Sequence, residues 1–239
     1  MGALTREVSH MDGATTRQVD VYQLGRQPYL PVWQAMRARM VGCQHHQPDA
    51  VWLVEPEPIY TLGQAGRSEH VLDPGAVPVI RVDRGGQVTY HGPGQLVVYP
   101  LLNLRRLGLG LRDYVTGMEE AIILTLAHWG IYGCRKRGAP GVYVDQAKIA
   151  AIGLRIKQHC TFHGLSLNVC PDLAPFTRIN PCGYAGLAVT SLHQLGVKVR
   201  LEALTPIFLQ FFAEQFALRL LPARAPLSRI LSGCDSTDE

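Results

Sequence analysis

The stretch that most constrains the fold is glycine-rich and runs Arg84-Gly85-Gly86-Gln87-Val88-Thr89-Tyr90-His91-Gly92-Pro93-Gly94-Gln95. Apolar runs at residues 77–82 and 96–104 flank it. Because glycine and proline weaken a strand ladder, the pattern predicts a loop between two strands. Glycine also lets the backbone approach a ligand closely and leaves its N–H groups free to donate. The added arginine, histidine and glutamines favour a binding loop over a plain hairpin connection.

Size and charge restrict the possible partners. The 239 residues are 47% apolar, enough for one large domain or two small ones. No apolar run reaches the ~18 residues of a membrane span, and no apolar signal segment opens the chain. A net charge of +4 without a dense Lys/Arg run suits acidic protein partners better than nucleic acid. We therefore expect a cytoplasmic protein with no nucleic-acid or membrane partner.

The cysteines predict a reducing compartment. None of the six forms a Cys-x-x-Cys motif, and no export signal accompanies them. An even number of cysteines in a long chain without such a signal is more typical of reduced thiols than of a disulfide framework. The positions are Cys43, Cys134, Cys160, Cys170, Cys182 and Cys234.

The periodicity predicts an α+β fold, with a mixed or antiparallel sheet covered by helices. Helices are expected at residues 30–43, 111–129 and 190–195, and from Thr205-Pro206 onward. Strands are expected at residues 50–54, 59–63, 77–82, 96–102, 142–144, 148–156, 162–169 and 197–201. We expect a disordered leader (1–18), a single domain (19–222) and a disordered tail (223–239).

Lys148 stands out because it begins an otherwise apolar strand face. Alternation along the strand would place Lys148, Ala150, Ile152, Leu154 and Ile156 on one side. A lysine that reaches solvent from a strand end is the simpler explanation. A lysine with a chemical role is the alternative.

Cys182 is the best candidate nucleophile. It lies between Pro181 and two glycine-containing turns, which would expose the thiol and offer backbone N–H groups to a developing oxyanion. A free thiol is only slightly ionised at neutral pH, so it needs a cation or base to react. Lys148 and His91 are candidates for that partner. An inert cysteine is the alternative reading.

Metal and nucleotide chemistry find little support. On a strand, His159 and His163 would be ~13 Å apart, too far for one zinc ion, so we expect no metal site. No Gly-x-x-x-x-Gly-Lys-Ser/Thr phosphate loop is present, and the glycine-rich stretch does not match an adenylate-binding loop. An acyl donor that arrives already activated therefore fits better than activation by ATP, and no cofactor is expected.

Four motifs together resemble the lipoyl(octanoyl) transferase family. They are the glycine-rich stretch, Lys148-Ile149-Ala150-Ala151-Ile152-Gly153, His163-Gly164-Leu165-Ser166-Leu167-Asn168-Val169 and Asn180-Pro181-Cys182-Gly183. The resemblance covers about residues 20 to 222. It implies a lipoate/biotin protein ligase-like α+β fold. One departure is Glu55-Pro56-Glu57-Pro58, which lacks a histidine expected after the first glutamate.

The resemblance also implies an activity. An octanoyl group would pass from octanoyl-acyl carrier protein to a lysine of lipoyl domains, the first step of endogenous protein lipoylation. The acceptors would be 2-oxoacid dehydrogenase complexes and the glycine cleavage H protein, and the enzyme is expected to be a monomer. Cys182 would form an acyl-thioester, Lys148 would be its partner, and His91 would orient either one. The implied substrate-binding residues are Arg84, Gly85, Gly86, Gln87, Val88, Thr89, Tyr90, His91, Ala151, Ile152, Gly153, Gly164, Leu165 and Ser166.

Two other functions stay open from the sequence. An ATP-dependent lipoate or biotin ligase of the same fold would not need the thiol, so blocking cysteines would spare it. A non-catalytic module that binds acyl groups or lipoyl domains would be indifferent to the loss of Cys182.

Overall fold

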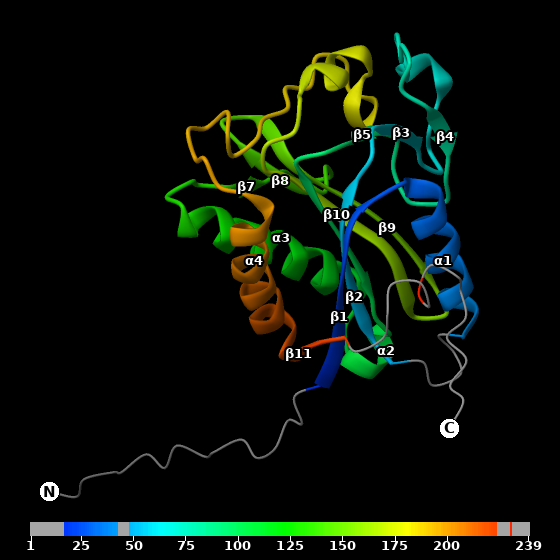
Figure 1. Ribbon diagram of the computed structural model, residues 1–239, viewed down its shortest axis with the longest axis vertical. Coiled ribbons are helices and arrows are strands. Elements are labelled where there is room, and N and C mark those ends of the chain that lie inside the picture. Colours follow the sequence, from blue (N-terminus) through cyan, green and yellow to red (C-terminus); the bar gives the residue numbers. More distant parts are fainter. Residues whose placement is uncertain (1–16, 43–47, 224–229, 231–239) are drawn as a thin grey trace, which may run out of the picture.

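The structure is a computed structural model that describes residues 17–42, 48–223 and 230. A large twisted sheet forms its centre, with helices on both faces, and a smaller sheet lies at one end (Figure 1). This confirms the α+β fold. No helix of the described residues is both long enough and apolar enough to cross a membrane.

The described part of the large sheet has eight strands. The pairs β11–β1 and β1–β2 are parallel and the others antiparallel, so the sheet is mixed as expected. In spatial order the strands are β11 (Leu218–Pro222), β1 (Arg17–Gln27), β2 (Ala50–Pro56), β6 (Gln95–Leu101), β10 (Cys160–Asn168), β9 (Ala147–Lys157), β8 (Gly141–Val144) and β7 (Cys134–Arg135).

The small sheet contains β4 (Val79–Arg81), β3 (Ile59–Leu62) and β5 (Val88–His91), in the order β4-β3-β5. The prediction that residues 84–95 form a loop throughout is wrong at β5. Alternating Val88 and Tyr90 are buried there, and the strand pairs with β3. Because one face of these four residues is apolar, the strand forms despite its short length and neighbouring glycines.

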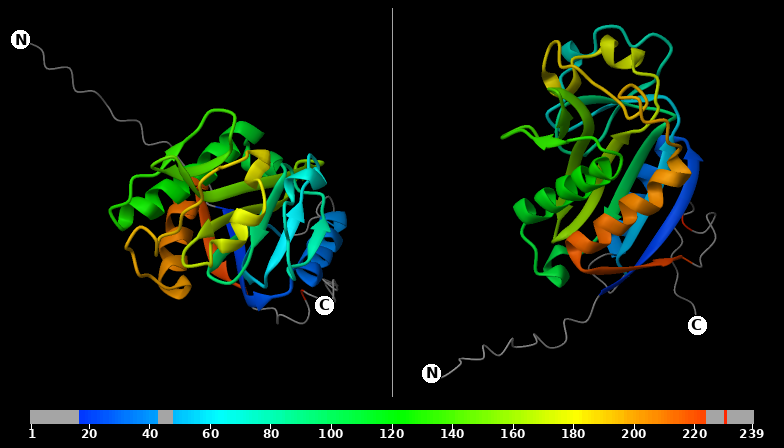
Figure 2. Two further views of the ribbon diagram at one scale, coloured as in Figure 1. Left: turned by 90° about the horizontal axis from the view of Figure 1, so that it is seen from above. Right: turned by 90° about the vertical axis from the view of Figure 1, so that its left-hand side faces the viewer.

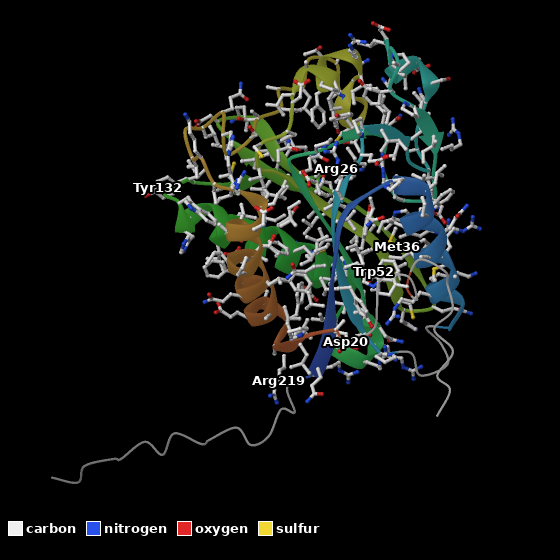
Figure 3. All side chains as sticks on the ribbon, in the orientation of Figure 1. Asp20, Arg26, Met36, Trp52, Tyr132 and Arg219 are labelled. Carbon is white, nitrogen blue, oxygen red and sulfur yellow. The ribbon has the colours of Figure 1, made fainter. Side chains whose placement is uncertain are left out.

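The helices cover the two faces of the large sheet unequally (Figure 2). The long helices α3 (Leu111–His128) and α4 (Leu201–Phe216) share one apolar core with strand residues such as Val51 and Leu53. Helix α1 (Tyr29–Gly42) covers the opposite face, where Met36 and Trp52 belong to one cluster (Figure 3). The short helical segments are α2 (Leu104–Leu107), η1 (Ser68–His70), η2 (Ala174–Arg178) and η3 (Pro181–Gly183).

The small sheet has an apolar cluster of its own. Its buried members are Tyr60, Leu62, Val88, Tyr90, Phe176 and Ile179. The last two come from the segment that leads to η3. That segment is tied to η1 by a bridge between Val71 and Ile179 and by a 2.8 Å hydrogen bond from Asn180 N to His70 O. The turn that carries Cys182 is therefore anchored to the small sheet.

Lys148 lies at the start of β9, just after a two-residue hairpin turn. Asp145 and Gln146 both have positive φ, as this tight turn requires. A bulge follows, because Val142 pairs with Ala150 whereas Tyr143 pairs with Lys148, which leaves Ile149 without a partner. The expected alternation from Lys148 to Ile156 is thus interrupted after its first residue.

Gly164 marks a close approach between β10 and β6. A Cβ atom at this position would lie 2.0 Å from the carbonyl oxygen of Val98, which is backbone and cannot move aside. We expect Gly164→Ala to lower the free energy of unfolding by roughly 2–3 kcal/mol, the cost of overpacking a sheet interior. Urea unfolding measures it. Gly108→Ala, where no atom lies within 4 Å of the added Cβ, is the comparison, although its positive φ gives that variant some strain of its own.

Several expected boundaries differ from the structure. Strand β1 begins at Arg17, inside the expected leader, whose other residues lie mostly outside the described ones. Within the expected tail, Ile230 is buried against the α1 cluster. No helix forms at 190–195 and no strand at 197–201. Instead α4 begins at Leu201 and contains Pro206, which has no N–H to donate to a carbonyl of the preceding turn.

The prediction of reduced thiols is wrong for Cys160, which is disulfide-bonded. Cys43 and Cys234 lie outside the described residues. Cys134, Cys170 and Cys182 are free, and Cys134 is exposed.

Candidate active site

A cavity of about 490 Å³ lies where β9 and β10 face the glycine-rich stretch. All of the site residues predicted from the sequence line it except Tyr90. Tyr90 points away and packs edge-on against Phe176, with ring centroids 5.5 Å apart. The four motifs, which are far apart in the sequence, therefore meet in one place. Tyr29, Tyr99, Leu111 and Val115 complete much of the wall.

Cys182 is held on a strained turn. Its backbone is left-handed, with φ 55° and ψ 15°, which is uncommon for a residue other than glycine. The N–H groups of Gly183 and Tyr184 bond to Asn180 O and Pro181 O within the turn. These two donors are therefore already used within the turn, and the expectation that backbone N–H groups of this loop serve an oxyanion stays a prediction. The turn instead fixes the direction of the thiol.

Lys148 reaches Cys182 directly. Its Nζ lies 3.1 Å from Cys182 Sγ and donates a second hydrogen bond of 3.1 Å to Pro140 O. The ammonium also lies 5.2 Å from the centre of the Tyr143 ring. The backbone of Lys148 is fixed on its outer side by hydrogen bonds with Ala188 O and Thr190 N. The pair is thus positioned before any substrate arrives.

The charge of Lys148 depends on this contact. Burial by itself lowers the pKa of the ammonium, but the negative charge of Cys182, its hydrogen bond and Tyr143 offset that effect, so the pKa is raised. The side chain is buried, which excludes the solvent-exposed lysine considered above. If the sulfur lost its charge, burial would remain as the main influence and would favour neutral lysine.

Arg84 organises the glycine-rich stretch. Its guanidinium donates to Thr61 O, Thr61 Oγ1, Gly85 O and Gln87 O at 2.6–3.0 Å. Gly85 N in turn donates to Leu154 O of β9 at 2.9 Å. A Cβ at Gly85 would lie 2.9 Å from the same oxygen, so glycine permits this contact. The stretch is therefore bound to both sheets.

His91 is a neutral histidine of defined tautomer. Gln95 Nε2 donates to Tyr90 O and to Asn168 Oδ1, since Asn168 Nδ2 is used by Thr190 O. Gln95 Oε1 must then accept from His91 Nδ1, 3.3 Å away, which leaves Nε2 unprotonated. Burial, followed by the charge of Arg84, lowers the pKa of His91 to about 3. No contact joins His91 to Cys182 or Lys148 among the described residues.

This low pKa predicts how acid affects stability. Folded His91 stays neutral while the unfolded chain takes up a proton below pH ~6.5, so stability is full above that pH and falls as the pH drops toward 3. We expect a loss of about 1.5 kcal/mol between pH 6.5 and 5 from this residue. Urea unfolding at the two pH values should show a smaller loss for His91→Gln. His128→Gln, at an exposed position, should keep the wild-type difference.

One polar cluster beside the cavity was missed from the sequence, and of its members only His163 lines the cavity. His163 Nε2 lies 2.8 Å from Asp83 Oδ1, which also accepts from Trp33 Nε1 at 2.8 Å. Arg155 pairs with the other carboxylate oxygen at 3.1 Å. Burial raises the pKa of Asp83, but the bonds from His163 and Trp33 outweigh it and hold the pKa at about 2. In the sequence, the only hint of this cluster is that Asp83 directly precedes Arg84.

No group of three or more His, Cys, Asp or Glu side chains within residues 17–42, 48–223 and 230 could hold a metal ion. His163, weighed above as a metal ligand with His159, is instead bonded to Asp83.

The mixed sheet, its flanking helices and the cavity are those of a lipoate/biotin protein ligase-like fold. Residues 28–213 match the family model described as the lipoyl protein ligase A/B catalytic domain. The octanoyltransferase of Xanthomonas campestris pv. campestris (strain B100) is 58% identical over 205 residues, which are 86% of this chain and 88% of that protein. The chain belongs to the lipoyl(octanoyl) transferase family and is an acyltransferase.

Solved structures agree on the fold. A crystal structure of lipoate-protein ligase A bound with ATP has a TM-score of 0.70 at 13% identity, and covers 91% of this chain and 93% of its own. Biotin protein ligase from Aquifex aeolicus in complex with biotin and ATP has a TM-score of 0.52 at 12% identity, with 83% and 70% covered. These likenesses concern the fold alone.

Proposed function

We propose that this protein transfers an octanoyl group from octanoyl-acyl carrier protein to a lysine of lipoyl domains through an acyl-thioester on Cys182. The observation that carries the proposal is the 3.1 Å contact between Lys148 Nζ and Cys182 Sγ at the wall of an apolar cavity. A thiolate attacks a thioester carbonyl readily, and the contact places the ammonium of Lys148 against the sulfur that would carry that charge. The name of the 58% identical relative supports the octanoyl group.

In the first half of the reaction, Cys182 forms a bond to the thioester carbonyl carbon and the carrier's thiolate leaves. Lys148 gives its proton to that leaving sulfur. Cys182 is then an uncharged thioester, and Lys148 has lost the anion that raised its pKa. Because the side chain is buried, it stays neutral at this stage.

In the second half, the amino group of the acceptor lysine attacks the Cys182 thioester. Neutral Lys148 accepts a proton from that nitrogen as the amide forms, and Cys182 leaves as a thiolate. The starting ion pair is restored and no proton is gained or lost by the enzyme. One lysine thus acts as acid and then as base, because the charge of its partner changes between the steps.

The cavity suits the acyl chain. The chain carries no polar atom beyond the carbonyl, and the wall contains Val88, Ile152, Leu154 and Leu165. Burial of the octanoyl methylenes at about 0.8 kcal/mol each contributes roughly 5–6 kcal/mol. His91, kept neutral, avoids placing a further charge beside the chain.

The partners follow from this chemistry. The donor is octanoyl-acyl carrier protein, and the acceptors are the lipoyl domains of 2-oxoacid dehydrogenase complexes and the glycine cleavage H protein. A monomer suffices, because the chain itself supplies both Cys182 and Lys148. A cytoplasmic location belongs to the same proposal.

Intact-protein mass spectrometry tests the proposal. Mixing the protein with octanoyl-acyl carrier protein and no ATP should add one octanoyl group, which peptide mapping should locate on Cys182. Adding a lipoyl domain should remove the group and modify the domain. If modification instead requires ATP and free octanoate, the protein is a ligase. If neither condition gives transfer, a binding module remains.

A further inference from the structure

Arg84 carries a buried charge that the loop-holding role does not explain. Its side chain is more than nine-tenths buried, and it makes no ion pair with any residue that the structure describes. Its hydrogen-bond acceptors are carbonyl and hydroxyl oxygens of Thr61, Gly85 and Gln87. Burying a charge without an anion is unfavourable, whereas neutral donors could hold the same oxygens. A charge retained at this cost is a reason to look for the anion that it serves.

The nearby carboxylate does not fill that role. Asp83 is the preceding residue, but its oxygens are taken by Trp33, His163 and Arg155. Tyr29 and Tyr99 lie near Arg84, and burial raises the pKa of both hydroxyl groups, so they stay neutral.

Cys182 is another group near Arg84 that can become an anion. It lines the same cavity as Arg84, and one residue connects the two. Arg84 Nη2 donates to Gln87 O at 2.7 Å, and a Cβ at Gly183 would lie 3.1 Å from Gln87 Cγ. Burial lowers the pKa of Arg84, and a negative charge on any of Tyr29, Cys182 or Tyr99 would act to raise it.

We infer that Arg84 is a second positive charge acting on Cys182 and, together with Lys148, favours the thiolate and the anionic oxygen formed when the thioester is attacked. The inference deepens the proposed function and rests on it for the importance of the thiolate. Lys148 acts by contact, whereas Arg84 acts through space across the cavity that both residues line. Arg84 is thus a positioning residue in two senses, since it holds the loop and sets the local field.

The positive charge of Arg84 also explains why the two cationic side chains have different roles. Lys148 must give up its proton when the first thiol leaves, whereas a guanidinium keeps its charge throughout. A positive charge therefore remains near the sulfur while Lys148 is neutral, and it helps Cys182 to leave as a thiolate in the second half. The other titratable groups that face this region are Tyr143, Tyr184, His70, His91 and His163.

The pH dependence of Cys182 alkylation tests the inference. Iodoacetamide reacts with the thiolate, and mass spectrometry of the Cys182 peptide gives the rate at each pH, with exposed Cys134 as an internal reference. We expect Arg84→Gln, which keeps donors but removes the charge, to raise the midpoint for Cys182 by about 1 pH unit. The midpoint for Cys134 should not move.

Two substitutions at Thr61 separate charge from structure. Thr61→Asp leaves Arg84 in place but supplies a carboxylate to its Nε and Nη2, so the midpoint should rise as in Arg84→Gln. Thr61→Val removes the same hydroxyl contact without adding charge, and its midpoint should stay within about 0.3 units of the wild type. Equal shifts in both Thr61 variants, or no shift in Thr61→Asp, would overturn the inference. If Arg84→Gln does not unfold cooperatively, the Thr61 pair decides.

The assay needs no acyl donor, so its outcome is independent of the proposed function. A protein that fails to take up octanoyl groups could still show the shift in the alkylation midpoint of Cys182. A protein that takes up octanoyl groups could likewise show no such shift. The two failures are therefore distinguishable.

Discussion

Replacing Cys182 with alanine is expected to abolish uptake of the octanoyl group and to reduce its transfer to a lipoyl domain by about 10⁴-fold or more. The thiol supplies the covalent step, and loss of a nucleophile that acts with a partner removes nearly all of the benefit of both. Transfer is followed by mass spectrometry of the lipoyl domain. The cavity should remain, so octanoyl-acyl carrier protein should still bind.

Two other free cysteines provide matched controls. Cys134→Ala and Cys170→Ala remove thiols that do not line the cavity, and both variants should retain transfer within about 2-fold of the wild type. Transfer by Cys182→Ala at a tenth of the wild-type rate or more would contradict a thioester on this residue.

Replacing Lys148 with methionine is expected to lower the rate of transfer by about 10³-fold near neutral pH, within the range for loss of an acid–base group. Methionine has a similar length and suits the buried position, so the fold should persist. The sulfur loses the ammonium at 3.1 Å, and the acceptor lysine loses its base. The burst with octanoyl-acyl carrier protein measures acylation of the enzyme. Subsequent addition of lipoyl domain measures transfer of the octanoyl group, so the two halves of the reaction are separated.

The pH dependence of the two half-reactions distinguishes loss of the ammonium from a purely structural effect of Lys148→Met. Without the ammonium, Cys182 should ionise at higher pH, so acylation by Lys148→Met should recover part of its rate as the pH rises. The second half should not recover to the same extent, because no base replaces the lysine. A uniform loss at every pH in both halves would argue that Lys148 only shapes the site. Lys157→Met, at an exposed position on the same strand, is the control.

The sequence predicted most of the cavity because its chemistry is concentrated in contiguous motifs. Each motif can be identified from its own short stretch of sequence. The three are glycine-rich residues 84–86, the strand that begins with Lys148, and the turn at Cys182. The α+β fold followed from helices and strands with clear periodicity, such as residues 111–129. What linked these pieces was the resemblance to a family, since spacing alone could not bring Lys148 and Cys182 into contact.

The parts that were missed depend on long-range packing. Strand β1 is polar at many positions and forms because β2 and β11 pair with it on either side. Strand β5 is hidden among glycines and needs β3 as a partner. The bond between His163 and Asp83 joins residues 80 positions apart, and neither residue is unusual in its own stretch. The bulge at Ile149 likewise depends on β8, so strict alternation along β9 could not reveal it.

The anchoring of Cys182 to the small sheet has a consequence for thermal inactivation. Cys182 is carried by a turn joined to η1 and the cluster around Phe176, whereas Lys148 belongs to the large sheet with its far larger core. A small cluster opens at a lower free energy than the whole domain. On heating, the two reacting partners should therefore separate while the large sheet is still intact, so that the enzyme becomes inactive at temperatures where spectroscopy still reports a folded protein.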